Sequence, residues 1–145
     1  MNQTIAIGSD HAGFALKESL VETLTQLGYA PLDLGTNGPD SVDYPDFAHA
    51  MAGALGAGKA DKGVLICGSG IGISMAANRH PDVRAALVHD ALGARMCRQH
   101  NDANVIVFGG RMIGIEVARA CLEIFLKTEF EGGRHQRRID KITPA

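Results

Sequence analysis

The segment 67–72, with the sequence Cys-Gly-Ser-Gly-Ile-Gly, is the part of this chain best suited to chemistry. Its three glycines allow the backbone to approach a ligand closely, and it leads into a predicted helix whose free N–H groups can bind an anion. In its thiolate form, a cysteine at the head of such a loop can act as a base or a nucleophile. A small buried side chain is the other interpretation of Cys67, and this pattern alone leaves both open.

The spacing of this loop differs from that of three familiar anion-binding loops. A dinucleotide-binding fingerprint needs glycine at position 73 and a cysteine phosphatase loop needs arginine there, but the residue is Ile73. A Walker loop needs a Lys-Ser or Lys-Thr pair, which this segment lacks. The loop therefore indicates an anion site of another kind.

Two polar pairs stand near other predicted element ends. Asp10 and His11 follow the first predicted strand, and His100 and Asn101 end a predicted helix. Each residue also has an ordinary structural interpretation. Asp10 suits a helix N-cap, His11 a turn and His100 the negative end of a helix dipole, while Asn101 can take the left-handed conformation that ends a helix.

The tail 131–145 carries a cluster of arginines. Arg134 and Arg138 are four residues apart, so they share a face if the tail is helical. Two guanidinium groups on one face suit a phosphate monoester, and Arg111 could join them. A solvated basic surface is the alternative. Nucleic acid is disfavoured because no aromatic residues are interleaved, and neither a zinc-ligand spacing nor a carboxylate cluster indicates a metal.

The elements that must position these residues alternate between short apolar runs and amphipathic segments. Predicted strands cover 4–8, 30–34, 62–67, 83–88 and 105–108; predicted helices cover 14–27, 46–57, a stretch ending at residue 78, 91–100 and 114–127, with a short helix in the tail. This alternation predicts an α/β fold with one open, mostly parallel sheet covered by helices.

Ligands of such sheets bind beyond the carboxyl ends of the strands. Asp10, His11, Cys67, Asp90 and the segment 109–111 all follow predicted strand ends. We therefore expect the site at this edge of the sheet.

Composition restricts the function classes. The 145 residues suit a single domain, and 46% hydrophobic with 21% charged residues excludes wholesale disorder. The net charge of −2 gives no indication of a nucleic-acid or membrane partner. The N-terminal segment has no secretory pattern, and the three cysteines have no disulfide spacing, so we expect a cytoplasmic protein. Cys97 and Cys121 lie on apolar helix faces and are expected in the core.

Five motifs together carry a family resemblance. In chain order they are Gly-Ser-Asp-His-Ala-Gly-Phe at 8–14, Asp-Tyr-Pro at 43–45, the cysteine loop at 67–72, Arg-Gln-His-Asn-Asp at 98–102 and Gly-Gly-Arg-His-Gln at 132–136. The chain closely resembles the type B ribose-5-phosphate isomerases. These belong to the sugar-phosphate isomerase family that includes the galactose-6-phosphate isomerase subunits.

The resemblance implies a Rossmann-like three-layer αβα sandwich with a five-stranded parallel sheet. It implies one isomerase domain over 1–145, whose tail 131–145 carries phosphate-binding arginines, in a homodimer or tetramer with shared active sites. It also implies metal-independent interconversion of ribose 5-phosphate and ribulose 5-phosphate, with no cofactor. Relatives without the cysteine use a glutamate just after the loop, where this chain has Ile73.

The resemblance also implies roles for particular residues. Those implied in catalysis are Cys67 as the base, His100 as the group that opens the sugar ring, and Ser69. Those implied in substrate binding are Asp10, His11, Tyr44, Gly68, Gly70, Ile71, Gly72, Asn101, Arg111, Arg134 and Arg138.

Three alternatives stay open, of which the least favoured is a nucleic-acid binder that uses the arginine tail. The same chemistry could act on a tetrose such as erythrulose 4-phosphate, or on a hexose such as allose 6-phosphate or galactose 6-phosphate. A non-catalytic phosphosugar-binding module is the second alternative, and an intact Cys67 together with His100 counts against it.

Overall fold

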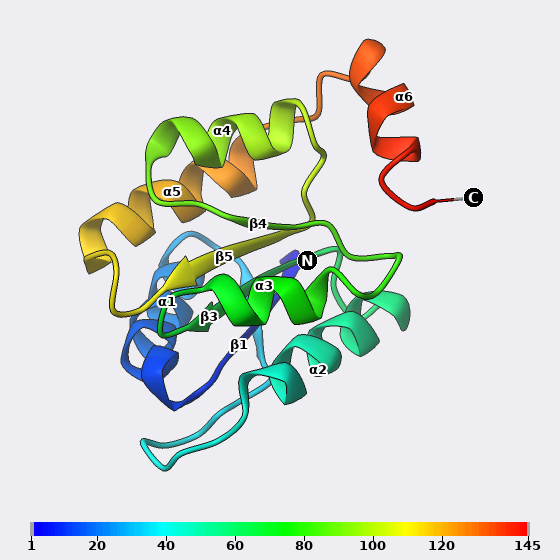
Figure 1. Cartoon of the computed structure of the whole chain (residues 1–145). Coiled ribbons are helices and arrows are strands. Elements are labelled where there is room, and N and C mark those ends of the chain that lie inside the picture. The colour runs from blue at the N-terminus through cyan, green and yellow to red at the C-terminus, as the bar shows by residue number, and fades with distance from the viewer. Residues whose placement is uncertain (1, 145) are drawn as a thin grey trace.

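The computed structural model describes residues 2–144 as a parallel sheet with helices on both faces (Figure 1). The strand order is β2-β1-β3-β5-β4. The strands are β1 (Thr4–Ser9), β2 (Ala30–Asp33), β3 (Lys62–Cys67), β4 (Ala85–Leu87) and β5 (Val105–Gly109). The helices are α1 (Phe14–Gln26), α2 (Tyr44–Gly56), α3 (Ile71–Ala77), α4 (Ala91–Gln99), α5 (Ile115–Lys127) and α6 (Arg134–Asp140), with one 3₁₀ turn, η1 (His11–Gly13).

The expected three-layer arrangement and five-stranded sheet are confirmed. Ile7 and Ile66 point into one core, where they pack with buried residues of α1, α4 and α5. Leu65 and Cys67 point into the other, where they pack with residues of α2 and α3. Because β1, β3 and β5 have helices on both faces, their sequences are continuous apolar runs rather than alternating ones.

Two elements begin two residues away from the sequence-based expectation, and the other strand and helix boundaries that differ do so by one residue. Helix α2 begins at Tyr44 rather than at residue 46, because Pro45 occupies the first turn, where its missing N–H group costs no hydrogen bond. Strand β4 covers only Ala85–Leu87, because it is the edge strand and pairs with β5 alone.

The two edges of the sheet carry different segments. Strand ends and the loops that follow them form the carboxyl edge, whereas α6 lies beside the opposite, amino edge (Figure 1). The expected short helix in the tail is confirmed as α6. Within residues 2–144, no helix combines the length and the apolar character that a membrane crossing requires.

Candidate active site

Cys67 is the last residue of β3, and its side chain is 4% exposed. Its Sγ accepts a hydrogen bond from the backbone N–H of Gly70 at 3.2 Å. Gly70 has a φ of +78°, in the left-handed region, and this turn directs the chain into α3. The Oγ atom of Ser69 accepts the N–H of Ile71 at 3.1 Å, which leaves the hydroxyl proton of Ser69 free to donate elsewhere. The loop thus holds a thiol and a hydroxyl close together.

The loop after β5 packs against the cysteine loop. The N–H of Gly110 donates to the carbonyl of Cys67 at 2.8 Å, and the N–H of Arg111 donates to the carbonyl of Gly68 at 3.0 Å. The side chain of Arg111 lies against Gly68, where its Nη1 atom is 3.5 Å from the position a Cβ atom would occupy. A cation therefore stands beside the glycine loop.

The segment after β1 contributes Asp10 and His11 to the same edge. The carboxylate of Asp10 caps η1 by accepting the N–H groups of Ala12 at 3.0 Å and Gly13 at 3.1 Å, so the expected capping role is confirmed. The Nδ1 atom of His11 accepts the N–H of Val42 at 3.1 Å. When the ring is neutral, its proton is therefore on Nε2.

Tyr44 closes this side of the site. Its ring lies against Gly72, where an added Cβ atom would stand 2.5 Å from Cζ. A cavity of about 500 Å³ is lined by residues 10, 11 and 41–46, and so joins Asp10 and His11 to Tyr44. One chain therefore brings together most of the residues expected to bind or convert substrate, which are Asp10, His11, Tyr44, Cys67, Gly68, Ser69, Gly70, Ile71, Gly72 and Arg111.

The remaining expected residues lie at the amino edge. His100 follows α4 directly, and the loop after it enters the amino end of β5. In the sheet, Val105 pairs with Gly63, and Cys67 stands four residues farther along β3, which is about 13 Å. His100 and Asn101 are thus separated from Cys67 by the length of the strands.

Helix α6 is held beside His100. The N–H of Glu131 donates to the carbonyl of Gln99 at 3.1 Å, and the ring of His135 stacks on that of His100 with centroids 4.4 Å apart. Arg134 and Arg138, which belong to α6, are therefore also at the amino edge, as Figure 1 shows for the helix. A cavity of about 910 Å³ at this edge is lined in part by Asn101 and by Gln136 and Ile139 of α6.

The left-handed residue after α4 is Asp102, with a φ of +45°, and not Asn101 as its residue type suggested. The carboxylate of Asp102 pairs with Nη1 of Arg98 at 2.7 Å. The Arg98 side of this ion pair is buried and the Asp102 side is partly exposed. The pair holds Asp102 in the left-handed conformation, and Asn101 lies at the rim of the larger cavity.

The other two cysteines are core residues, as expected. Cys97 and Cys121 belong to the core between the sheet and α1, α4 and α5. Burial raises the pKa of the Cys97 thiol to about 11 and also raises the pKa of Cys121. Both thiols therefore stay protonated near neutral pH and are poor bases.

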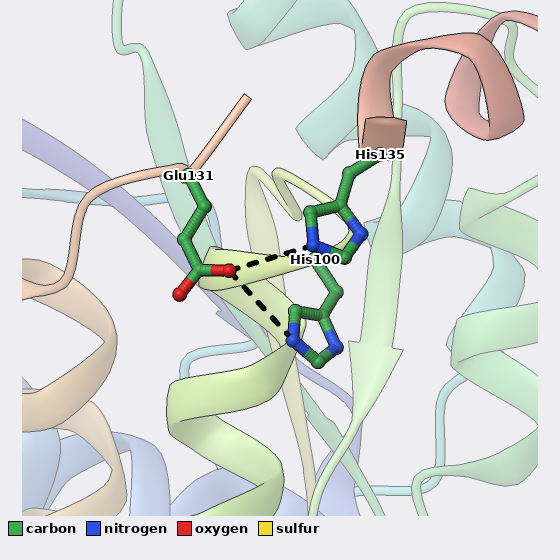
Figure 2. A group of neighbouring side chains, drawn as sticks. All are labelled: His100, Glu131 and His135. Carbon is green, nitrogen blue, oxygen red and sulfur yellow. Dashed lines mark ion pairs between the residues drawn. The ribbon is translucent and has the colours of Figure 1, made fainter. Parts of the chain in front are cut away.

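Sequence reasoning missed one cluster of polar side chains. His100, Glu131 and His135 point toward one another (Figure 2) and could together hold a metal ion. Glu131 and His135 are four residues apart, a spacing that predicts a contact between their side chains near the start of a helix. Nothing in the sequence joins that pair to His100, because the contact depends on how α6 packs beside α4.

Gly70→Ala is expected to destabilise the fold and to reduce any activity that needs the loop. An alanine here would adopt a left-handed φ, and its Cβ atom would lie 2.5 Å from Cδ1 of Leu87. Strain and overpacking together should lower the free energy of unfolding by about 2–4 kcal/mol. Urea denaturation measures this. Gly114→Ala is the matched control, because its φ is −85° and nothing lies within 4 Å of the added atom. Equal stability of the two variants would contradict the expectation.

Comparison with known proteins gives a consistent result. A model of the family described as Ribose/Galactose Isomerase matches residues 5–142. Ribose-5-phosphate isomerase B of Escherichia coli strain K12 is 44% identical over 139 residues, covering 96% of this chain and 93% of that protein.

Solved structures agree with this match. Ribose-5-phosphate isomerase B of Clostridium thermocellum aligns with a TM-score of 0.95 at 47% identity, covering 97% of this chain and 95% of the other. Type B ribose 5-phosphate isomerase of Trypanosoma brucei aligns with a TM-score of 0.94 at 45% identity, covering 98% and 97%. Since family model, sequence relatives and solved structures all span nearly the whole length, this chain belongs to the ribose/galactose isomerase family.

Proposed function

We propose that this protein interconverts ribose 5-phosphate and ribulose 5-phosphate, with the thiolate of Cys67 as the base. The observation that carries the proposal is the setting of Cys67, buried at the end of β3 in a glycine loop beside Tyr44 and Arg111. Membership in the family supports the reaction class, and the names of the relatives support the substrate.

The chemistry is a proton transfer between adjacent carbons. Cys67 removes the proton from C2 of the open-chain aldose and returns it to C1 through an enediolate. Negative charge develops on the enediolate oxygens, and backbone N–H groups of the loop 68–72 stabilise it. Ser69 relays the hydroxyl proton: it donates its own proton to O1 and recovers the one that O2 loses, while its oxygen also accepts the N–H of Ile71. No redox step is involved.

The remaining roles divide between the sugar and its phosphate. Asp10, Tyr44 and Asn101 contact the sugar hydroxyls, and His100 transfers the proton that opens the ring. The phosphate is bound by His11, Arg111, Arg134 and Arg138. Its binding energy, remote from the reacting carbons, holds them in position.

A second copy of the chain completes each site in this proposal. His100, Asn101 and α6 lie at the amino edge, about one strand length from Cys67 in the same chain. Helices α3 and α4 expose large apolar side chains, namely Ile71, Met75, Leu92 and Met96. Exposed apolar surface is typical of an interface, and a homodimer or a tetramer built from such dimers would cover it.

We place this function in one isomerase domain, residues 1–145, whose tail 131–145 carries the phosphate-binding arginines. A cytoplasmic location fits its chemistry. All three cysteines are free, and free thiols are typical of a reducing compartment.

A substrate panel tests the proposal. The purified protein is assayed with aldose phosphates of four, five and six carbons, and the highest kcat/KM is expected with ribose 5-phosphate. A higher kcat/KM with a tetrose or hexose phosphate would identify that compound as the substrate and would still support the proposed isomerisation. Binding without turnover of every compound would favour a phosphosugar-binding module.

Arg134→Ala and Arg138→Ala are each expected to weaken sugar-phosphate binding about ten- to a hundredfold, because a charge-assisted hydrogen bond is lost. Activity on the unphosphorylated sugar should barely change. Arg137→Ala is the matched control, since it removes the same charge from the same exposed helix. Comparison of KM values measures the effect, and equal KM values for all three variants would indicate a solvated surface instead.

A further inference from the structure

Three side chains with metal-ligating atoms meet where α4 ends and α6 begins (Figure 2). His100 follows α4, Glu131 precedes α6, and His135 is the second residue of α6. Their ligand atoms all lie within 4.8 Å of one another. The proposed function uses His100 and gives no role to Glu131 or His135.

The distances in this cluster are longer than direct hydrogen bonds. The Oε1 atom of Glu131 lies 3.4 Å from Nε2 of His135 and 3.9 Å from Nε2 of His100. Two ligands bound at about 2.0–2.1 Å to a tetrahedral ion stand about 3.3 Å apart. The separation of Glu131 from His135 already matches that value. His100 is farther from Glu131, so its ring, which stacks on that of His135, must turn toward the carboxylate to bind the same ion.

His135 supplies an independent observation. Its side chain is 7% exposed, and its Nε2 atom is buried without a hydrogen-bond partner. Figure 2 shows that this atom points at the carboxylate of Glu131. Most buried polar atoms in proteins have a hydrogen-bond partner, so a ring nitrogen that lacks one and faces a carboxylate is suited to hold a ligand shared with that carboxylate.

We propose that His100, Glu131 and His135 bind a zinc ion. Two imidazole nitrogens with one carboxylate oxygen form a ligand set that zinc uses in proteins, with the fourth position left to water. Imidazole nitrogen favours zinc over magnesium and calcium, which prefer oxygen ligands. The ion ties the start of α6 to the end of α4.

The bound ion has a consequence for catalysis, which rests on the proposed function. Zinc bound at Nε2 of His100 blocks that nitrogen, so it can no longer exchange a proton with the sugar ring. The site is therefore inhibitory: zinc occupies the nitrogen that opens the sugar ring and binds no atom of Cys67, which lies at the other edge of the sheet in the same chain.

Binding is tested first, by competition between the full-length protein and a chromophoric zinc chelator. We expect one tightly bound zinc ion per chain. Glu131→Gln and His135→Asn should weaken it at least about tenfold, since even the loss of an outer-shell partner has such an effect. His49→Asn is the control, because His49 and His80 form another pair of ring nitrogens 2.7 Å apart. Zinc binding that survives both cluster variants, or is lost in His49→Asn, overturns the proposal.

Inhibition is tested with two substrates. Zinc should suppress turnover of ribose 5-phosphate, and Glu131→Gln should need at least about tenfold more zinc for the same inhibition. Turnover of a tetrose 4-phosphate should be affected much less, because its fourth oxygen carries the phosphate and cannot close a ring. Equal inhibition of both substrates would mean that zinc acts on a step other than ring opening, which overturns the inhibitory role.

The two experiments separate this inference from the proposed function. If the protein binds zinc through the cluster but converts neither substrate, the metal site is supported and the proposed isomerase function is contradicted. If the protein isomerises ribose 5-phosphate but does not bind zinc, the proposed function is supported and the metal site is contradicted.

Discussion

Cys67→Ala is expected to abolish isomerisation while leaving the chain folded and able to bind sugar phosphate. The variant loses the proposed base but keeps the glycine loop, the Tyr44 ring and Arg111 around the substrate. General acid–base groups contribute about 10²- to 10⁴-fold to rate, so kcat should fall by at least about 100-fold. Steady-state kinetics measure the loss, and calorimetric titration with sugar phosphate measures the retained binding.

Two other cysteine variants are the matched controls. Cys97→Ala and Cys121→Ala remove buried thiols whose pKa is raised by burial, and which are therefore not thiolates near neutral pH. Each should cost stability through a small cavity and leave kcat near that of the unmodified protein. Near-normal turnover in Cys67→Ala, or an equal loss of kcat in all three variants, would contradict the assignment of the base.

His100→Asn is expected to impair turnover of ribose 5-phosphate strongly and turnover of an open-chain tetrose phosphate much less. Ribose 5-phosphate is ring-closed in solution, so a proton must be transferred before the carbons can react. Removing that general acid–base group should lower kcat about 100-fold or more. Equal losses on the two substrates would mean that His100 has another role.

The same variant tests whether two chains share a site. Subunits carrying Cys67→Ala are mixed with subunits carrying His100→Asn and allowed to exchange. If each site takes Cys67 from one chain and His100 from its partner, every hybrid dimer contains one intact site. With random pairing half of the dimers are hybrids, so the mixture should recover about a quarter of the unmodified activity. Verified hybrids that stay inactive would rule out the sharing.

Much of the fold could be predicted from local patterns. The apolar runs that became β1, β3 and β5 are continuous because each strand is covered on both faces, and such runs can be recognised without knowing their partners. Boundaries depended on finer details. Proline is typical of loops, yet Pro45 stands in the first turn of α2. A proline is tolerated there and not farther along the helix, so its place in the helix depends on where the helix begins.

The sequence by itself determined the place of the cysteine loop at a strand end and indicated the chemistry proposed for it. Cys67, Ser69 and Gly70 are close in the chain, so their contacts depend on one local turn. Only the tertiary structure decided which of the other residues join them. Helix α4 runs back along the sheet and leaves His100 at the amino edge, where α6 packs against it, one strand length from Cys67. The grouping of His100 with Glu131 and His135 was also decided by the tertiary structure. It depends on contacts between segments that are distant in the chain, and residue spacing within one segment does not predict such contacts.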